Sequence, residues 1–301
     1  MSEFLFGSPG SEKHEGDFAL LLEDLSVHSR VFDQVEDNPD AVASERIALD
    51  VAAMHAQYWR APELDREPIL GGSSYEFPMG DACRESPSRL SDLERAWKAQ
   101  FGRNLFRDEG TKHSEELTRL LCGPDCDRII DRICEVFSSR PQTLLHGDLR
   151  ADNIFRTYPT AAGGDAPPRI TYIDWQLFHS GPAGSEFSQA WMSSLPPAER
   201  RKDRSILRSY HERLTQLNPE ANTYAHETVV DDYVLGCVLW WAAYVTVGAN
   251  ALSTEGVPPS SRMKRLWATC VPWVLIALED HDALGRVRRL LDDDVRPRSS
   301  R

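Results

Sequence analysis

The chain has 301 residues, which is enough for one large domain or two modest ones with a substantial core. Hydrophobic residues make up 41% of it and charged residues 27%, as in ordinary soluble globular proteins. The net charge of −13 argues against nucleic acid as a partner, because the phosphates would be repelled.

The first residues carry no signal for a folded element. Residues 1–17 are polar and contain glycine, so a flexible N-terminus is expected there. The run from Gly7 to Lys13 resembles a phosphate loop only superficially, since it lacks the Gly-Lys-Ser/Thr ending and no strand leads into it. No signal peptide is predicted, because no basic region leads into an apolar core. The compact apolar run of residues 18–22 suits a buried strand.

Most of the remaining chain has helical periodicity. Residues 61–87 are rich in Pro, Gly, Ser and charge, and predict a long loop. Pro124 stands at a plausible first helical position, and Pro272 is expected to kink the last helix. The predicted helices span about 39–58, 88–101, 114–121, 124–137, 186–193, 198–214, 228–248 and 261–280.

Neither a membrane span nor a zinc site is predicted. The most apolar run, residues 233–247, is short for a bilayer and indicates a buried helix. Cys122 and Cys126 have no second pair to complete a zinc site, so free thiols in a reducing compartment are expected. We therefore expect a soluble, cytoplasmic protein that has no membrane or nucleic-acid partner.

The strand-like segments in the middle of the chain frame a group of polar residues. Residues 143–145 lead into residues 146–153, which read His-Gly-Asp-Leu-Arg-Ala-Asp-Asn. Residues 154–157 and 170–173 flank a Gly- and Pro-rich connection and predict a β-hairpin. If these strands pair antiparallel, Asn153 and Asp174 emerge at the same end, beside the loop that carries Asp148.

This arrangement has the groups that a magnesium-dependent phosphoryl transferase needs. Asp148 would orient the attacking hydroxyl or take its proton, while Asn153 and Asp174 would be oxygen ligands of Mg²⁺. Asp152 is expected to face solvent or to brace the loop. Each of these residues alone is a common turn former, but the complete pattern favours a site.

These motifs, together with Leu-Leu-Leu-Glu-Asp-Leu-Ser at residues 20–26 and Ala-Ala-Met-His-Ala-Gln-Tyr-Trp at residues 52–59, resemble a known superfamily. The chain is similar, over residues 18–280, to the aminoglycoside phosphotransferase and choline kinase-like proteins, and within them to the ecdysteroid-kinase-like (CHK kinase-like) branch. The resemblance implies an α+β fold: a protein-kinase-like large lobe that is mostly α-helical and has a short catalytic β-hairpin.

The resemblance also implies roles for individual residues. Asp148 would be the catalytic aspartate, Asn153 and Asp174 would bind magnesium, and His146 would be a structural member of the loop. The backbone of a hinge would meet the adenine ring of ATP, and the hinge residues are Leu22, Glu23, Asp24 and Leu25.

Two further positions are interpreted in the light of the resemblance. Glu186 stands where relatives carry an aspartate that opens a helix, so bracing of the catalytic loop by an aspartate is not expected here. His55 is expected to serve packing rather than chemistry.

The domain organisation follows from the same comparison. Residues 1–25 would be a remnant of the small lobe, residues 26–295 the large lobe, and residues 296–301 a disordered tail. Only 17 residues precede Phe18, too few for the strands and helix that would carry a Gly-rich loop and a lysine.

The expected function is ATP- and Mg²⁺-dependent transfer of the γ-phosphoryl group to a hydroxyl of a small molecule, with weak or no activity in this chain. The alternative is a non-catalytic kinase-like module that binds a metabolite or a protein. The acidic net charge mildly suits a cationic acceptor, such as an amino sugar or an amino alcohol.

Overall fold

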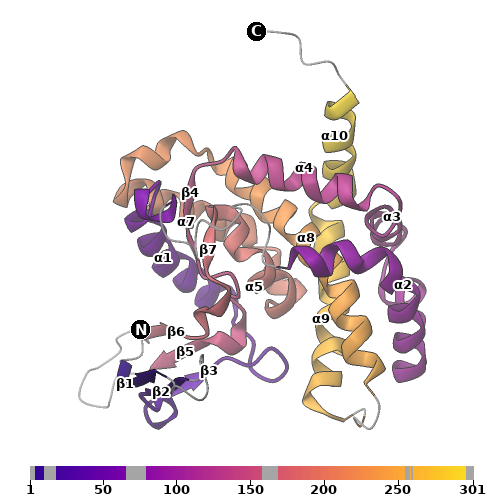
Figure 1. Cartoon of the computed structure of the whole chain (residues 1–301), viewed down its shortest axis with the longest axis horizontal. Helices are drawn as coiled ribbons and strands as arrows, with labels where there is room; N and C mark the ends of the chain where they lie inside the picture. The colour runs from indigo at the N-terminus through magenta and orange to yellow at the C-terminus, as the bar shows by residue number, and fades with distance from the viewer. Residues whose placement is uncertain are drawn as a thin grey trace.

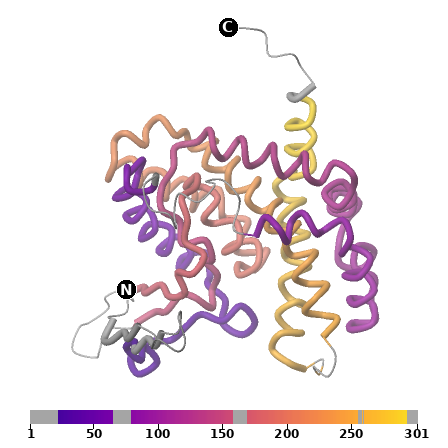
Figure 2. Tube along the Cα trace, viewed as in Figure 1, coloured from indigo at the N-terminus to yellow at the C-terminus, as the bar shows by residue number. Residues whose placement is uncertain are grey.

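The computed structural model describes residues 4–9, 18–65, 79–157, 169–254, 258 and 260–295. It confirms an α+β fold that is mostly helical and has small antiparallel sheets. Figure 1 shows strands β1, β2, β3, β5 and β6 gathered at one end of the molecule, with β4, β7 and the helices making up the rest. The trace in Figure 2 shows that segments far apart in the sequence meet at this end, because β5 lies next to β3.

The strands form three small sheets. The predicted β-hairpin is confirmed, since β5 pairs antiparallel with β6 and Ile154 faces Tyr172. The strand predicted at residues 18–22 is also confirmed, as β2. The sheets are β1 (Phe4–Pro9) with β2 (Phe18–Leu22), β3 (Ser29–Val31) with β5 (Ile154–Thr157) and β6 (Arg169–Tyr172), and β4 (Gln142–Leu145) with β7 (His179–Pro182).

The sequence did not predict β1, β3 or β7. The expectation of a flexible N-terminus is wrong for residues 4–9, which form β1, and residues 10–17 lie outside the described residues. Strand β1 gains its hydrogen bonds from β2, and β3 gains its hydrogen bonds from β5, more than a hundred residues further along the chain. Short strands of this kind are stabilised by distant partners rather than by their own residue pattern.

Ten α-helices are present in the described parts of the chain. The segment predicted as one helix at 198–214 is divided into α6 and α7, and α10 was not predicted. The bounds are α1 Ala41–Gln57, α2 Gly80–Phe101, α3 Lys112–Leu121, α4 Cys126–Ser138, α5 Phe187–Ser194, α6 Pro197–Arg200, α7 Asp203–Leu217, α8 His226–Ser253, α9 Arg262–Asp280 and α10 Ala283–Val295.

Helix α2 corrects the prediction of a loop through residue 87. It begins at Gly80 and contains Pro87 in its interior. Pro87 has no N–H group for the carbonyl of Cys83, one turn earlier, but the Cys126 thiol donates to that carbonyl at 3.6 Å. The helix therefore continues through the proline because α4 supplies the missing donor. Helix α4 itself begins at Cys126, so Pro124 precedes it and is not its first residue.

Helix α8 is the centre of the core. It packs against α2, α5, α7 and α9, and its most apolar segment is 78% buried within the protein. By length and composition alone the helix would be able to cross a membrane, but this burial favours a core helix. The prediction of a buried helix at residues 233–247 is therefore supported. The tail predicted at 296–301 lies outside the described residues.

Candidate active site

A glycine fixes the path of the loop that follows β4. Strand β4 pairs with β7, where Leu145 faces His179, and leads directly into the loop. Gly147 has a φ of +80°, and a Cβ atom there would lie 2.0 Å from the carbonyl oxygen of Leu177. Both the backbone conformation and the close approach therefore require glycine at this position.

A buried glutamate braces the same loop from behind. The carboxylate of Glu186 accepts hydrogen bonds from the backbone N–H groups of His146 (2.6 Å) and Gly147 (3.2 Å). Its other side faces His55, whose Nε2 lies 3.5 Å from Oε2, and His55 Nδ1 lies 2.6 Å from the hydroxyl of Tyr210. An acid therefore does brace the loop here, and it is a glutamate. His55 is more than a packing residue, since it supports this acid.

The electrostatics of Glu186 agree with this bracing role. Its burial opposes ionisation, but His55, His146 and the backbone hydrogen bond together hold the pKa of Glu186 below its usual value. The glutamate is therefore ionised at neutral pH and makes charge-assisted hydrogen bonds to the loop.

Asp148 is buried and is held by two side chains. Asn153 Nδ2 donates to Asp148 Oδ2 at 3.0 Å and to its backbone oxygen at 2.9 Å, and Arg150 Nε donates to the same Oδ2 at 3.2 Å. Burial raises the pKa of Asp148, while Arg150, Asn153 and Gln189 partly oppose the increase. A carboxylate with a raised pKa is a stronger base than an exposed aspartate.

Asp174 lies at the expected end of the β-hairpin. The N–H of Ile173 donates to the carbonyl of Asn153 at 3.0 Å, which places Asp174 one residue beyond a direct contact with Asn153. Asp174 has a φ of +63°, a conformation that aspartate tolerates better than most residues. Its side chain is exposed, and no described residue forms a hydrogen bond or an ion pair with it.

His146 has the structural role that the sequence predicts. Its Nε2 lies 2.8 Å from the carbonyl oxygen of Ile173, and its ring centroid is 4.4 Å from that of Trp175. These two contacts hold the residues on both sides of Asp174. His146 therefore connects the loop of Asp148 to the turn that carries Asp174.

Asp152 braces the loop through contacts that were not predicted. It accepts hydrogen bonds from Arg150 Nη1 (2.9 Å), the backbone N–H of Gln34 (3.1 Å) and Arg262 Nη2 (2.7 Å). Arg262 begins α9, so one ion pair joins that helix to the catalytic loop. No sequence pattern indicates this pairing, because the residues are brought together only by tertiary packing.

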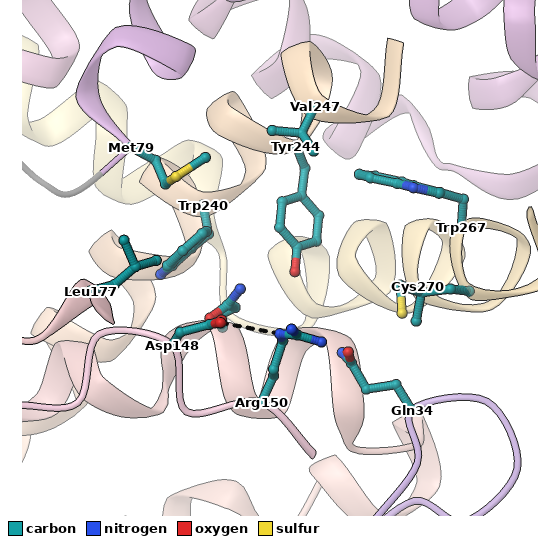
Figure 3. A pocket seen from close by; sticks show the side chains of 12 residues that line it. Gln34, Met79, Asp148, Arg150, Leu177, Trp240, Tyr244, Val247, Trp267 and Cys270 are labelled. Carbon is teal, nitrogen blue, oxygen red and sulfur yellow. Dashed lines mark hydrogen bonds and ion pairs between the residues drawn. The ribbon is translucent and has the colours of Figure 1, made fainter. Parts of the chain in front are cut away.

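A pocket of about 240 Å³ opens beside Asp148. Figure 3 shows Asp148 and Arg150 joined by their ion pair at its floor, with Tyr244 pointing its hydroxyl toward them. Trp240 lies on one side of Tyr244, and Trp267 lies on the other. Other lining residues are Gln34, Met79, Leu177, Gln189, Val247, Leu266 and Cys270.

The proposed adenine hinge is not part of this pocket. None of the residues from Leu22 to Leu25 lines it. Leu22 is 51% exposed at the end of β2, and the side chain of Asp24 caps a short 3₁₀ turn, Leu25–Val27. The segment leads into β3, which pairs with β5 of the catalytic hairpin. The hinge role stays a prediction.

Asn153 and Asp174 have the donor chemistry that Mg²⁺ requires. The amide nitrogen of Asn153 is used by Asp148, whereas its Oδ1 accepts no hydrogen bond from any described residue. The Asp174 carboxylate is equally free among the described residues. Two such oxygen donors, with phosphate oxygens and water as the remaining ligands, fit the usual way that proteins bind Mg²⁺. In the described ranges, no group of three or more His, Cys, Asp or Glu side chains is placed so that it could hold a metal ion by itself.

The described residues thus define a mostly helical α+β protein. At one end of its β-hairpin lie the buried side chains of Asp148 and Asn153 and the exposed side chain of Asp174. A family model described as "Uncharacterized oxidoreductase dhs-27" (DUF1679) matches residues 48–257, and the chain belongs to this family. The family falls in the CHK/ecdysteroid-kinase-like group. No curated protein matches the chain.

Proposed function

We propose that this protein transfers the γ-phosphoryl group of ATP to a hydroxyl group of a small molecule, with Mg²⁺ as the cofactor, and that it is active, in contrast to the weak or absent activity expected from the sequence. The observation that carries the proposal is the position of Asp148. Its carboxylate is buried at the floor of an apolar pocket and is bonded to Asn153, and Asp174 stands at the same end of the hairpin.

Asp148 would serve the acceptor. An alcohol in the pocket donates its proton to the Asp148 carboxylate while its oxygen bonds to the γ-phosphorus, and the bond to the bridging oxygen breaks to release ADP. The hydrogen bonds from Asn153 and Arg150 fix the orientation of this carboxylate. The raised pKa of Asp148 strengthens it as a base.

Asn153 and Asp174 would serve the nucleotide, as the ligands of the metal ion. Bound Mg²⁺ would neutralise the negative charge of the phosphate groups. Arg150 is the one cationic side chain among the described residues that line the pocket, so it would face the transferred group.

The family description contains the word oxidoreductase, and a dinucleotide-dependent oxidoreductase is a second candidate. Such enzymes commonly bind the cofactor at a Gly-rich turn between a parallel strand and a helix. All strand pairs in the described part of the chain are antiparallel. The geometry of the site and the CHK kinase-like grouping therefore support a kinase better than this alternative.

Calorimetric titration with ATP, with and without Mg²⁺, tests the nucleotide half of the proposal. The variant is Asp174→Asn, because asparagine also tolerates a positive φ and the backbone is not strained. Asp282→Asn is the matched control, since Asp282 is exposed, has a φ of +49° and lies in the turn between α9 and α10.

The wild type and Asp282→Asn should bind ATP only with Mg²⁺, and Asp174→Asn should bind about tenfold or more weakly. Binding that is the same with and without Mg²⁺, or that Asp174→Asn leaves unchanged, would rule out Asp174 as a metal ligand. Binding of NAD(P)H in place of ATP would support the oxidoreductase alternative.

A further inference from the structure

The pocket beside Asp148 has little charge to offer a ligand. Among the described residues that line it, the ionic side chains are Asp148 and Arg150, which pair with each other through Arg150 Nε and Asp148 Oδ2 at 3.2 Å. A cationic ligand would find one carboxylate that is already neutralised, together with a guanidinium that repels it. An anionic ligand would face the carboxylate of Asp148. Both charged classes would also lose their hydration in an apolar cavity.

Aromatic rings form the larger part of the wall. The Trp240 and Tyr244 centroids are 6.1 Å apart with planes at 73°, and the Tyr244 and Trp267 centroids are 5.4 Å apart at 67°. Figure 3 shows the three rings side by side above Asp148. Faces and edges arranged in this way suit a ring or a compact hydrocarbon group, which gains dispersion and buries apolar area against them.

Two glutamine amides add hydrogen-bonding capacity without charge. Gln34 is 2% exposed and donates through Nε2 to Ser193 at 3.1 Å. Gln189 is 7% exposed, and its Oε1 has no hydrogen-bond partner among the described residues. An unpaired buried amide oxygen is costly, and a ligand hydroxyl that donated to it would remove this cost.

From these observations we infer that the acceptor is an uncharged alcohol whose apolar body packs against the aromatic rings. This inference rests on the proposed function and narrows it. The cavity of about 240 Å³ has room for a ring-sized group, since an apolar cavity of about 150 Å³ holds benzene. It replaces the cationic acceptor that the net charge suggested, because the net charge does not describe the pocket.

Ligand-observed NMR titrations without nucleotide test the inference independently of catalysis. The decisive pair is neohexanol and choline, which have the same shape and differ in a tert-butyl group against a trimethylammonium group. Phenethyl alcohol serves as a ring-containing alcohol, and glucosamine as an amino sugar. Neohexanol should bind about tenfold or more tightly than choline, and phenethyl alcohol at least as tightly as neohexanol.

A filling substitution shows whether binding occurs in this pocket. Val247→Trp places a large side chain in the pocket from α8, and the loss of alcohol binding should be at least about tenfold. Val42→Trp is the control, because it makes the same change at a position that is 76% exposed on α1. The control should bind like the wild type.

Three results would overturn the inference: tighter binding of choline or glucosamine than of neohexanol, binding of none of the four compounds, or alcohol binding that Val247→Trp leaves unchanged. Aromatic rings also attract quaternary ammonium groups, so tighter binding of choline than of neohexanol would indicate a cation–π interaction in the pocket. Alcohol binding without phosphoryl transfer would contradict the proposed function, although the preference of the pocket for uncharged alcohols would stand. Phosphoryl transfer to choline or to an amino sugar would support the proposed function and contradict the inference of an uncharged acceptor.

Discussion

At the scale of the residue, Asp148 lies in a buried environment that disfavours its ionised form. Burial raises its pKa, although Arg150, Asn153 and Gln189 partly compensate. Glu186 is linked to the same loop through the backbone N–H of His146, and its pKa lies below the usual value. The two acids therefore divide the roles at the site. In the proposed reaction Asp148 would accept a proton, whereas Glu186 stays ionised and holds the loop.

The raised pKa of Asp148 predicts a conflict between stability and function. In the pH range between its unfolded and folded pKa values, the folded state binds more protons than the unfolded state, so stability falls as pH rises. The full penalty is present above the folded pKa of Asp148. Asp148→Asn removes it, and the variant should equal or exceed the wild type in free energy of unfolding at pH 7.

Urea unfolding at several pH values measures this difference. The advantage of Asp148→Asn should shrink as the pH falls through the folded pKa of Asp148, and it should vanish below the unfolded pKa of about 3.9. A variant that is clearly less stable than the wild type at pH 7 would show that the ion pair with Arg150 outweighs the cost of burial.

At the scale of the element, close approach between helices explains positions that sequence reasoning passes over. Gly236 lies within the apolar run that was predicted as a buried helix, and the sequence does not indicate why glycine is required at this position. In the structure α5 packs against α8 at this point, and a Cβ on Gly236 would lie 2.1 Å from Ser188 Oγ. Ser188 cannot easily move, because its hydroxyl donates to the carbonyl of Tyr233 at 2.9 Å.

Gly236→Ala should therefore destabilise the protein by roughly 1–3 kcal/mol, although alanine favours helices. Gly80→Ala, in the first turn of α2, is the matched control because nothing lies within 4 Å of its added Cβ. Thermal or urea unfolding should show a loss for the first variant and no loss for the second. Equal effects would mean that α5 and α8 pack less closely than described.

Several elements could be predicted from the sequence, and the reasons for the failures are physical. The hairpin of β5 and β6 was predicted because two strand-like runs flank a Gly- and Pro-rich connection. Strands β3 and β7 were missed because their partners are distant in the sequence. Strand β1 was missed although its partner β2 is near in the sequence, because residues 1–17 were interpreted as polar and flexible. The start of α2 was misplaced because a thiol on α4 compensates for Pro87, and no local rule includes that contact.

At the scale of the whole molecule, the site is assembled from segments across the chain. The motif residues His146, Asp148, Asn153 and Asp174 were recognisable in the sequence because they lie close together or flank one hairpin. The acceptor pocket was not recognisable, because α8 and α9 supply its aromatic wall only after they pack together. Spacing along the chain predicts the local part of a site, and tertiary packing determines the remainder.

The ion pairs of α9 show how tertiary packing positions the part of the site that the sequence does not predict. Arg262 joins α9 to Asp152 of the catalytic loop and to Asp33, and Arg265 pairs with Glu36. The helix that carries Trp267 and Cys270 to the pocket is thereby tied to the loop that carries Asp148. The wall and the floor of the pocket are therefore positioned relative to each other by charged contacts that are invisible in either segment alone.

The central claim is phosphoryl transfer by Asp148, and ³¹P NMR of the purified protein with ATP, Mg²⁺ and a panel of uncharged and cationic alcohols tests it most directly. The account predicts a new phosphate monoester signal that requires Mg²⁺ and that Asp148→Asn slows by about 10²–10⁴-fold, the usual contribution of general base catalysis. Asp282→Asn should form the monoester at the wild-type rate. The absence of any monoester with the wild-type protein, or equal rates for the wild type and Asp148→Asn, would contradict the account.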